Sequence, residues 1–401
     1  MLNNLLLKKC LLTIAASASL FILSCTHTID NINTTSEQNK TFEFSYQNPI
    51  TSGIDKDGIR DAQIFRDGDW WYMTGTSYPH WSRQEDEASG KLNKGVILYR
   101  SKNLTDWENR GYIVQPVGKH KWYYRRFWAP EIQKVEGKYY ALFNARNDEL
   151  GYVGQYTGYA VSDKIEGPYT VVTEEKPLTG GNDLTFYHEN GTTWAFWNQG
   201  HKKGIRFAEI NLAKGEFTTE PQTAIKAGPL DYAYDDKGKL LKEPGYDGRP
   251  KPKVAKYYEW DSIGIEGAYV IKEKGTYYLF YSSWTRGYEI GYATAKSITG
   301  PWTKHSNNPF YGAMNKQVTE ERGFKYTGDV NSPFNHVGHN AIFRGPDGRL
   351  WLSCHGIAHG KSPFLVMDPI WIDEDGALKS DGPTYTKQTI KLTAEQYKLV
   401  K

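Results

Sequence analysis

The sequence has little cysteine, little net charge and few long apolar runs. Its 401 residues contain three cysteines, and 49 basic against 46 acidic side chains give a formal net charge of +3. A charge so close to balance excludes the strongly basic surface that a nucleic-acid-binding domain needs, so we expect no nucleic-acid partner. Apolar runs of 18 or more residues are absent beyond residue 24, which excludes a protein with several membrane-spanning helices.

The first 24 residues have the pattern of an export signal. Lys8 and Lys9 precede an apolar stretch at residues 11–23, which is shorter than the roughly 20 residues that a membrane-spanning helix needs. The stretch ends in Ile22-Leu23-Ser24-Cys25, which resembles the site at which bacterial lipoproteins are cleaved and lipidated. We therefore predict a lipoprotein signal peptide at residues 1–24 and lipid on Cys25. An ordinary secretory signal is the alternative.

A polar segment follows the predicted lipidation site. Residues 25–43 lack hydrophobic periodicity and predict a flexible spacer. The protein would then belong to the bacterial cell envelope, anchored to the outer membrane on its periplasmic face or at the cell surface, with the lipid as its only contact with the membrane. Once Cys10 leaves with the signal and Cys25 carries lipid, Cys354 is the remaining thiol. The fold must therefore rely on its hydrophobic core instead of internal disulfides.

Aromatic residues and glycine are abundant. The 13 Trp, 29 Tyr, 16 Phe and 39 Gly residues favour many short strands joined by tight turns. Five segments repeat one layout, in which a polar or charged residue, an apolar strand start, a glycine-containing turn and an aromatic strand follow one another. These segments begin at Asp61, Glu131, Asp183, Glu266 and His339. The repeat predicts an all-β protein.

The spacing of the five segments predicts how they are arranged. They recur at intervals of 52 to 83 residues, which suits sheets of four short strands with insertions and is too long for leucine-rich repeats. We therefore predict a five-bladed β-propeller at residues 44–390, followed by a C-terminal tail at residues 391–401. Two β-sandwiches in tandem are the alternative. We expect the protein to be a monomer.

The innermost strand of each propeller blade lines a central channel, so the residues that begin these strands converge on one axial pocket. The residues that would meet there are Asp61, Asp183, Glu266 and His339. Glu266 lies among apolar residues, which raises a carboxyl pKa and suits a proton donor. Asp61 follows Arg60, whose charge would keep it ionised and able to act as a base. The alternative interpretation is that each acid is a solvated turn residue.

Five short motifs surround these residues. They are Arg60-Asp61-Ala62-Gln63-Ile64-Phe65, Trp128-Ala129-Pro130-Glu131-Ile132, Asn182-Asp183-Leu184-Thr185-Phe186, Ile265-Glu266-Gly267 and Gly338-His339-Asn340. In order and spacing they resemble glycoside hydrolase family 43, from Tyr46 to Asp375. The resemblance implies an inverting site in which Asp61 is the general base, Glu266 the general acid, and Asp183 a third carboxylate that keeps the pKa of the acid high. Inversion requires the acid and base carboxyl groups to lie roughly 6.5–9.5 Å apart, with water between them.

The sequence departs from that family in two places. The family commonly has proline directly after the base aspartate, where this chain has Ala62. A long polar insertion at Leu230–Lys256 separates the third and fourth repeats. We expect this insertion to be either a solvated surface loop or a loop that closes one end of the substrate groove.

Other residues are predicted to bind substrate or metal. Aromatic rings near the strand ends can stack on sugar faces, and the candidates are Trp81, Phe127, Trp128 and Trp284. Arg126 is a candidate for contact with an acidic or sulfated substrate. His339 stands where some family members have a histidine that binds calcium or a water cluster, although calcium prefers oxygen ligands and a hydrogen-bonded core histidine is the alternative. We expect no required cofactor, and a structural calcium ion is the one candidate.

The resemblance implies an oligosaccharide substrate and an exo-acting, inverting glycosidase. It would release L-arabinofuranose or D-xylose from plant cell-wall oligosaccharides, as an α-L-arabinofuranosidase or β-xylosidase does. One alternative is an inverting hydrolase of algal galactans, of the galactosidase or 3,6-anhydro-galactosidase type, but those enzymes have a catalytic histidine where this chain has Ile265. Another alternative is a surface propeller that binds glycans without cutting them, since a lipid anchor and many aromatic rings suit that role too.

Overall fold

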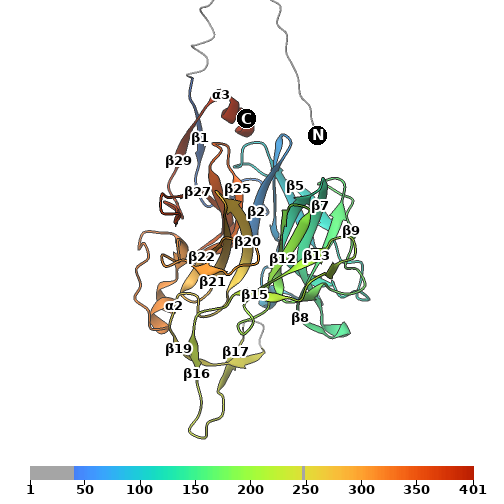
Figure 1. Ribbon diagram of the computed structural model, residues 1–401, viewed down its shortest axis with the longest axis vertical. Coiled ribbons are helices and arrows are strands. Elements are labelled where there is room, and N and C mark those ends of the chain that lie inside the picture. Colours follow the sequence, from blue (N-terminus) through green and yellow to red (C-terminus); the bar gives the residue numbers. More distant parts are fainter. Residues whose placement is uncertain (1–39, 246–248) are drawn as a thin grey trace, which may run out of the picture. The chain divides into compact units, whose positions relative to one another are not determined.

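The computed structural model of the protein describes residues 40–245 and 249–401 (Figure 1). The predicted signal peptide, the predicted lipidation site at Cys25 and the predicted spacer up to residue 39 lie outside these residues. Strands make up most of the described structure, as the sequence predicts. No helix within residues 40–245 and 249–401 is long and apolar enough to cross a bilayer.

Five antiparallel sheets of four or five strands form the blades in the described part of the chain, and they confirm the predicted β-propeller. The first blade contains β2 (Arg60–Asp67), β3 (Trp70–Thr76), β4 (Val96–Ser101) and β5 (Glu108–Val114). The second contains β6 (Arg125–Val135), β7 (Lys138–Asn147), β8 (Tyr152–Ser162), β9 (Thr170–Val171) and β10 (Thr179–Gly180). The third contains β11 (Asn182–Glu189), β12 (Thr192–Asn198), β13 (Ile205–Asn211), β14 (Glu216–Phe217) and β15 (Gln222–Ile225).

The last two blades follow the insertion. The fourth contains β20 (Glu266–Glu273), β21 (Thr276–Ser283), β22 (Gly287–Ala295), β23 (Thr303–Lys304) and β24 (Tyr311–Met314). The fifth contains β25 (Phe334–Arg344), β26 (Leu350–Ala358), β27 (Pro363–Ile372) and β28 (Leu378–Lys379). One short helix, α2 (Lys316–Glu321), and two 3₁₀ turns, η1 (Ser82–Gln84) and η2 (Asp148–Leu150), lie in the connections.

The first strand of each blade is the innermost one. β2, β6, β11, β20 and β25 contact one another in that order, and β25 contacts β2, so they enclose the axis as a ring. Each of these strands continues through a tight turn into the second strand of its blade. The turns contain Gly68, Gly137, Gly191, Gly275 and Gly348, whose φ angles lie between 57° and 81°. Positive φ explains why glycine recurs at these positions in the sequence.

The hydrophobic core consists of layers between blades. In the described residues, five clusters of buried apolar side chains each join two neighbouring blades. Between the first and second blades, for example, Leu98 of β4 packs in the same cluster as Phe127 of β6 and Phe143 of β7. The rings of these two phenylalanines have centroids 5.3 Å apart. The abundant aromatic residues therefore stabilise contacts between the sheets.

The first and last strands of the domain pair with each other. β1 (Phe42–Tyr46) lies antiparallel to β29 (Gln388–Leu392). Beyond β29, α3 (Ala394–Tyr397) and η3 (Lys398–Val400) fold back on the domain, where Tyr397 stacks on Phe42 and the Trp71 indole donates to the main-chain oxygen of Leu399 at 2.6 Å. Two predicted boundaries are thereby corrected. β1 begins inside the predicted spacer, and residues 391–401 are packed structure instead of a separate tail.

A buried carboxylate connects these end segments to the last two blades. Asp368 on β27 accepts hydrogen bonds from the hydroxyls of Tyr46, Tyr311 and Thr384 at 3.0, 2.6 and 2.6 Å. The main-chain N–H of Thr384 and the side-chain amide of Asn48 also donate to it, at 3.0 and 3.3 Å. Five donors thus converge on one carboxylate from β1, β24 and the segment before β29.

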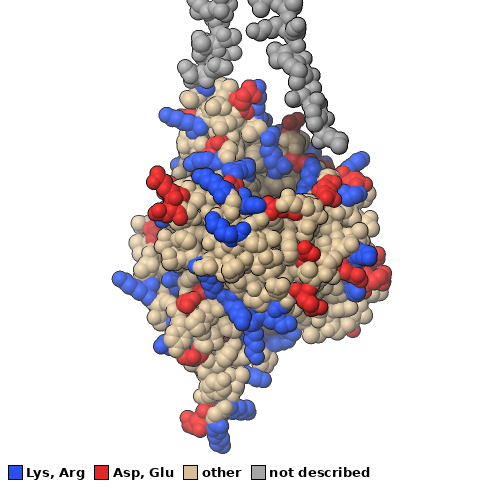
Figure 2. Space-filling model, in the orientation of Figure 1, with Lys and Arg blue, Asp and Glu red and all other residues tan. Residues whose placement is uncertain are grey.

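The insertion forms an arm. β16 (Leu230–Tyr232) pairs with β19 (Val254–Tyr257), and β17 (Lys242–Pro244) pairs with β18 (Pro250–Pro252). In Figure 1 the arm projects beyond the blades at the bottom of the view, and Figure 2 shows basic side chains gathered around its base. Arg249 donates to the main-chain oxygen of Val153 in the second blade at 2.8 Å.

We expect Asp368→Asn to lower the free energy of unfolding by about 2–4 kcal/mol, because an amide cannot accept all five hydrogen bonds and leaves buried donors unpaired. Urea unfolding followed by tryptophan fluorescence measures the change. The control is Asp381→Asn, which alters an exposed acid in the same region and should stay within about 0.5 kcal/mol of the wild type. Equal stabilities of the two variants would contradict the role given to Asp368.

Candidate active site

Each innermost strand has a bulge near its start. In β2 the pairing with β3 shifts between Arg60 and Gln63. The same shift recurs between Trp128 and Glu131, Asn182 and Thr185, Glu266 and Tyr269, and Gly338 and Ala341. The residues with positive φ in these bulges are Asp61, Ala129, Asp183, Gly267 and His339, at 43° to 66°. A bulge redirects the side chain of its unpaired residue. In three blades the redirected side chain is polar and lines the axial pocket, as Asp61, Asp183 and His339 do.

The bulges correct two assignments in the predicted repeat. Glu266, predicted as the start of the fourth segment, lies level with Arg60 and Asn182, and Gly267 occupies the place that is equivalent to Asp61. Glu131, predicted as the start of the second segment, lies two residues beyond the bulge, level with Gln63 and Thr185. Ala129 occupies the place that is equivalent to Asp61. Glu131 is buried away from the pocket wall and accepts a hydrogen bond from the Thr185 hydroxyl at 2.7 Å, and burial raises its pKa to about 7.

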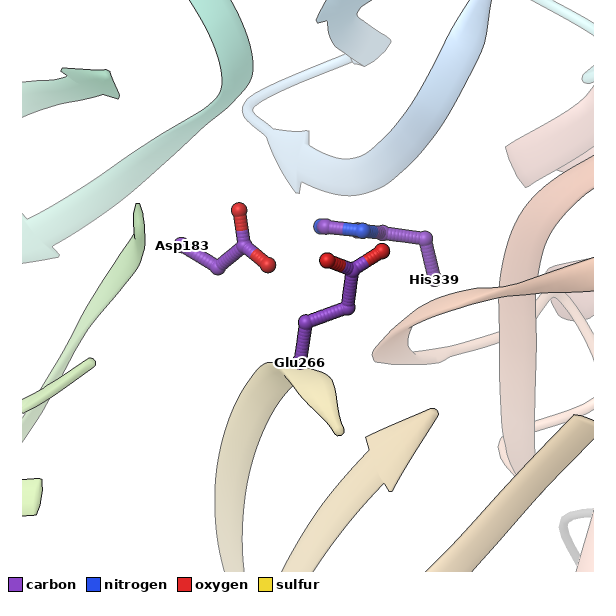
Figure 3. Close-up of side chains that lie close together, drawn as sticks. All are labelled: Asp183, Glu266 and His339. Atoms are coloured by element: carbon purple, nitrogen blue, oxygen red, sulfur yellow. The ribbon is translucent and has the colours of Figure 1, made fainter. Parts of the chain in front are cut away.

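A cavity of about 990 Å³ opens where the innermost strands begin. Its walls include the four predicted axial residues, Asp61, Asp183, Glu266 and His339. Figure 3 shows that Asp183, Glu266 and His339 point toward one another from β11, β20 and β25. One carboxyl oxygen from each acid and one ring nitrogen lie within 4.8 Å of one another. The structure therefore brings together residues that are far apart in the sequence.

Asp61 is held as a carboxylate. The Thr76 hydroxyl donates to Oδ2 at 2.6 Å, and the Arg60 guanidinium lies 3.7 Å from Oδ1. Nδ1 of His339 and Nδ1 of His355 lie 3.3 and 3.4 Å from Oδ1. Burial disfavours the charged form, but the charge of Arg60, the neighbouring His339 and the hydrogen bond from Thr76 outweigh it, so the pKa of Asp61 lies well below its usual range. His355 is neutral, because burial lowers its pKa well below the usual value, and its Nδ1 accepts the main-chain N–H of Asp61 at 3.0 Å. Oδ1, which accepts no hydrogen bond of good geometry from the described residues, is free to take a proton.

Glu266 retains its proton to higher pH. It is partly buried, and burial followed by the neighbouring charge of Asp183 raises the pKa of Glu266 to about 7. The Trp284 indole and the Tyr288 hydroxyl both donate to Oε1, at 2.6 and 2.9 Å. Near neutral pH a large share of the Glu266 side chains therefore carries a proton that can be donated.

Asp183 supports the acid from the neighbouring blade. Its N–H donates to Oδ1 of Asn144 at 2.9 Å, and the Asn144 amide donates back to Oδ1 of Asp183 at 3.0 Å. Oδ2 accepts the main-chain N–H of Gly267 at 2.9 Å. Because Gly267 directly follows Glu266, Asp183 both fixes the start of β20 and keeps a negative charge beside the acid.

His339 contacts Asp61 directly and reaches Glu266 through Tyr288. Its Nδ1 lies 3.3 Å from Oδ1 of Asp61 and 3.2 Å from the Tyr288 hydroxyl. Burial lowers the pKa of His339, but the charges of Asp61, Asp183 and Glu266 outweigh burial and raise it. Asp183, Glu266 and His339 do not fit a calcium site, because calcium takes about six to eight oxygen ligands. A bound calcium ion would also hold Glu266 ionised. A water-cluster role for His339 stays a prediction.

The polar pocket at the end of a five-bladed ring can be compared with known proteins. A sequence profile described as glycosyl hydrolases family 43 matches residues 46–378. The chain belongs to this family. It is therefore a glycoside hydrolase, as the sequence predicts.

Curated family 43 relatives are distant in sequence. Xylosidase/arabinosidase 43A of Humicola insolens is 26% identical over 296 residues, covering 68% of this chain and 80% of that protein. The extracellular endo-alpha-(1->5)-L-arabinanase of Thermotoga petrophila is 23% identical over 376 residues, covering 79% of this chain and 69% of that protein. The two names differ in substrate and in mode of attack.

Solved structures show the same fold. The crystal structure of a thermostable family-43 glycoside hydrolase has a TM-score of 0.61 at 24% identity, covering 86% of this chain and 98% of that one. The endo-1,4-beta-xylanase of Bacteroides thetaiotaomicron has a TM-score of 0.59 at 21% identity, covering 83% of this chain and 98% of that one.

Three of the five predicted substrate-binding residues line the pocket of this family 43 member, namely Trp81, Trp128 and Trp284. The other two predictions are wrong. Phe127 is fully buried in the core between the first and second blades, because successive strand residues point to opposite faces and Trp128 takes the pocket side. Arg126 is buried, and its Nε donates to Glu85 at 2.7 Å. No described residue of the arm lines the pocket, so the arm does not rim it as one alternative expected.

Sequence reasoning missed residues on the second and third strands. Asn144 on β7 and His355 on β26 contact Asp183 and Asp61, and Tyr288 on β22 contacts Glu266. The second-strand residues that pair opposite the starts of the bulges are all polar: Thr76, Asn144, Asn198, Ser282 and His355. A polar residue near the end of each aromatic second strand was the available signal.

We expect hydrolysis to decline above about pH 7 as Glu266 loses its proton. Asp183→Asn should move this alkaline limb to lower pH by about one unit, because removing a neighbouring negative charge makes Glu266 easier to ionise. The asparagine oxygen can still accept the Gly267 N–H. Profiles of kcat/KM against pH measure the shift, and a limb that stays in place or moves upward would contradict the role given to Asp183.

Proposed function

We propose that this family 43 member is an inverting, exo-acting glycosidase that releases L-arabinofuranose or D-xylose from plant cell-wall oligosaccharides. The observation that carries the proposal is the presence, in one pocket, of an ionised Asp61 and a Glu266 that keeps a proton up to about pH 7. An inverting hydrolase needs this combination, because one proton leaves the attacking water while another reaches the leaving oxygen.

The reaction uses one water molecule and two carboxyl groups. Oδ1 of Asp61 takes a proton from the water as the water oxygen bonds to the anomeric carbon. Glu266 gives its proton to the glycosidic oxygen as the bond between that oxygen and the anomeric carbon breaks. The Tyr288 hydroxyl and Nδ1 of His339 link Oδ1 of Asp61 to Oε1 of Glu266. This linkage through two intervening groups supports a separation that admits water between the acid and the base.

The relatives' names support a pentose substrate. Besides the xylosidase/arabinosidase and the arabinanase, a beta-xylosidase of Formosa agariphila is 22% identical, covering 82% of this chain and 50% of that protein. The tryptophans around the carboxyl groups, Trp81, Trp128 and Trp284, offer flat faces for the C–H groups of a sugar ring.

The alternatives from the sequence are weaker. A propeller that only binds glycans disagrees with membership of a family of hydrolases. Nothing in the described residues favours an algal galactan, and Ile265, where such an enzyme would have its histidine, is buried in the core between the third and fourth blades.

Purified protein should hydrolyse aryl arabinofuranosides or aryl xylosides, and Glu266→Gln should lower kcat about 10²–10⁴-fold, since the acid is lost. Glu131→Gln is the matched control, because Glu131 is also a buried acid with a raised pKa but lies outside the pocket wall. It should retain wild-type turnover. Proton NMR of the first product should show the anomer opposite to the substrate. Retained configuration would contradict inversion, and absent turnover on all glycosides would contradict the function.

Product release over time separates exo from endo action. On arabinan and arabinoxylan oligosaccharides we expect the monosaccharide to be the main product from the earliest time points, resolved by ion-exchange chromatography. An early ladder of intermediate oligosaccharides would instead indicate endo action.

We also propose that the protein is a monomeric lipoprotein of the outer membrane. The support is the sequence around Cys25, whose preceding residues have the lipoprotein pattern. Cys25→Ala should abolish labelling by radioactive palmitate and should move the protein from the membrane pellet to the soluble fraction. A wild-type protein that is unlabelled and soluble would contradict the anchor.

A further inference from the structure

Glu266 receives its hydrogen bonds unevenly. Oε1 accepts one from the Trp284 indole at 2.6 Å and one from the Tyr288 hydroxyl at 2.9 Å. Within the described part of the chain, Oε2 has one donor, the side-chain amide of Asn182 at 3.4 Å. Two short hydrogen bonds therefore converge on one oxygen of the acid, while the other oxygen has a single long one.

The chemistry of these donors decides which oxygen can carry the proton. An indole N–H donates and cannot accept, so Oε1 must accept from Trp284 in either protonation state of the acid. The Tyr288 oxygen also lies 3.2 Å from Nδ1 of His339. When that nitrogen is protonated, it donates to the phenol oxygen and leaves the phenol hydrogen directed at Glu266. Two donors then occupy both lone pairs of Oε1, and the acidic proton belongs on Oε2.

We propose that Trp284 and Tyr288 are positioning residues that keep the acidic proton of Glu266 on Oε2. The proposal rests on the proposed function, in which Glu266 is the general acid. It gives Trp284 a role in proton placement that is separate from the predicted stacking on a sugar. The reaction benefits because the proton starts on the oxygen that has only one long hydrogen bond to the protein.

The two donors are fixed before substrate binds. The rings of Trp284 and Tyr288 stack with centroids 3.7 Å apart and planes inclined by 11°. Arg322 donates to the main-chain oxygen of Trp284 at 2.6 Å. Gly264, with φ of 61°, lies so close that a Cβ there would approach Cδ1 of Trp284 to 3.1 Å. A stacked, clamped pair needs little rearrangement during proton transfer, which is the condition for effective electrostatic support of a transition state.

Trp284→Phe keeps a ring against Tyr288 and removes the N–H donor. Because that donor stabilises the ionised carboxyl, its loss should raise the pKa of Glu266 and move the alkaline limb of kcat upward by about one pH unit. The proton is then free to occupy either oxygen. On the plateau below the alkaline limb, where the acid is protonated in both proteins, we expect kcat to fall about twofold for aryl glycosides with poor leaving groups, since about half of the acidic protons then lie on Oε1. It should change little for aryl glycosides with good leaving groups, which need no proton.

Two further variants test whether the effect belongs to the hydrogen bond. Trp128→Phe makes the same change at another pocket tryptophan, whose indole nitrogen has no hydrogen-bond partner in the described residues. It should alter KM and leave the pH limb and the leaving-group dependence in place. Tyr288→Phe removes the second donor to the same oxygen and should shift the limb in the same direction as Trp284→Phe. Thermal unfolding by circular dichroism confirms that each variant is folded.

The outcomes separate the two proposals. If the wild type hydrolyses glycosides and Trp284→Phe keeps its pH limb and leaving-group dependence, the positioning role is wrong and the proposed function stands. If the wild type hydrolyses none, the proposed function fails, and infrared difference spectra decide the positioning role. The carboxyl band that disappears in Glu266→Gln reports the titration of Glu266. A titration shifted upward in Trp284→Phe supports the role, and an unchanged or lowered one overturns it.

Discussion

A residue with positive φ near the start of each innermost strand determines which side chains reach the axis. Side chains point alternately to the two faces of a regular strand. Without bulges, only every second residue of an innermost strand would point toward the axis. The bulge makes two successive residues available at the pocket, as Arg60 and Asp61 or Asn182 and Asp183 show. A φ angle near 60° is energetically unfavourable for ionisable, non-glycine residues. Such residues occur here in the catalytic pocket.

The axial residues acquire different properties from their surroundings. Asp61 lies beside a guanidinium and two imidazole rings, whereas Glu266 lies beside another carboxylate and neutral donors. The same chemical group is therefore an anion at one side of the pocket and an acid that keeps its proton to higher pH at the other. His339 contacts Asp61 and Tyr288, and Tyr288 in turn donates to Glu266, so these two side chains link the two carboxyl groups.

Much of this arrangement could be predicted from the sequence, because strand starts, turn glycines and aromatic strands repeat in it. The four axial residues at the pocket were identified that way. Glu131 was misplaced because a bulge adds a residue to the strand, and the periodicity of the sequence does not reveal it. Phe127 was misplaced because the bulge also decides which face of the strand each side chain points to. The partners Tyr288 and His355 come from outer strands, whose register against the inner strand depends on tertiary packing.

The pairing of β1 with β29 also brings the first and last strands of the domain to one end of the propeller. The segments that follow β29 pack against Trp71 and the turn at Asp347, which lie at the hairpin ends of the blades, and the pocket opens at the other end. Phe42 stacks on Tyr397 at that same far end. The chain therefore enters and leaves the propeller at the end opposite the pocket, and no residue of β1 or β29 lines the pocket wall.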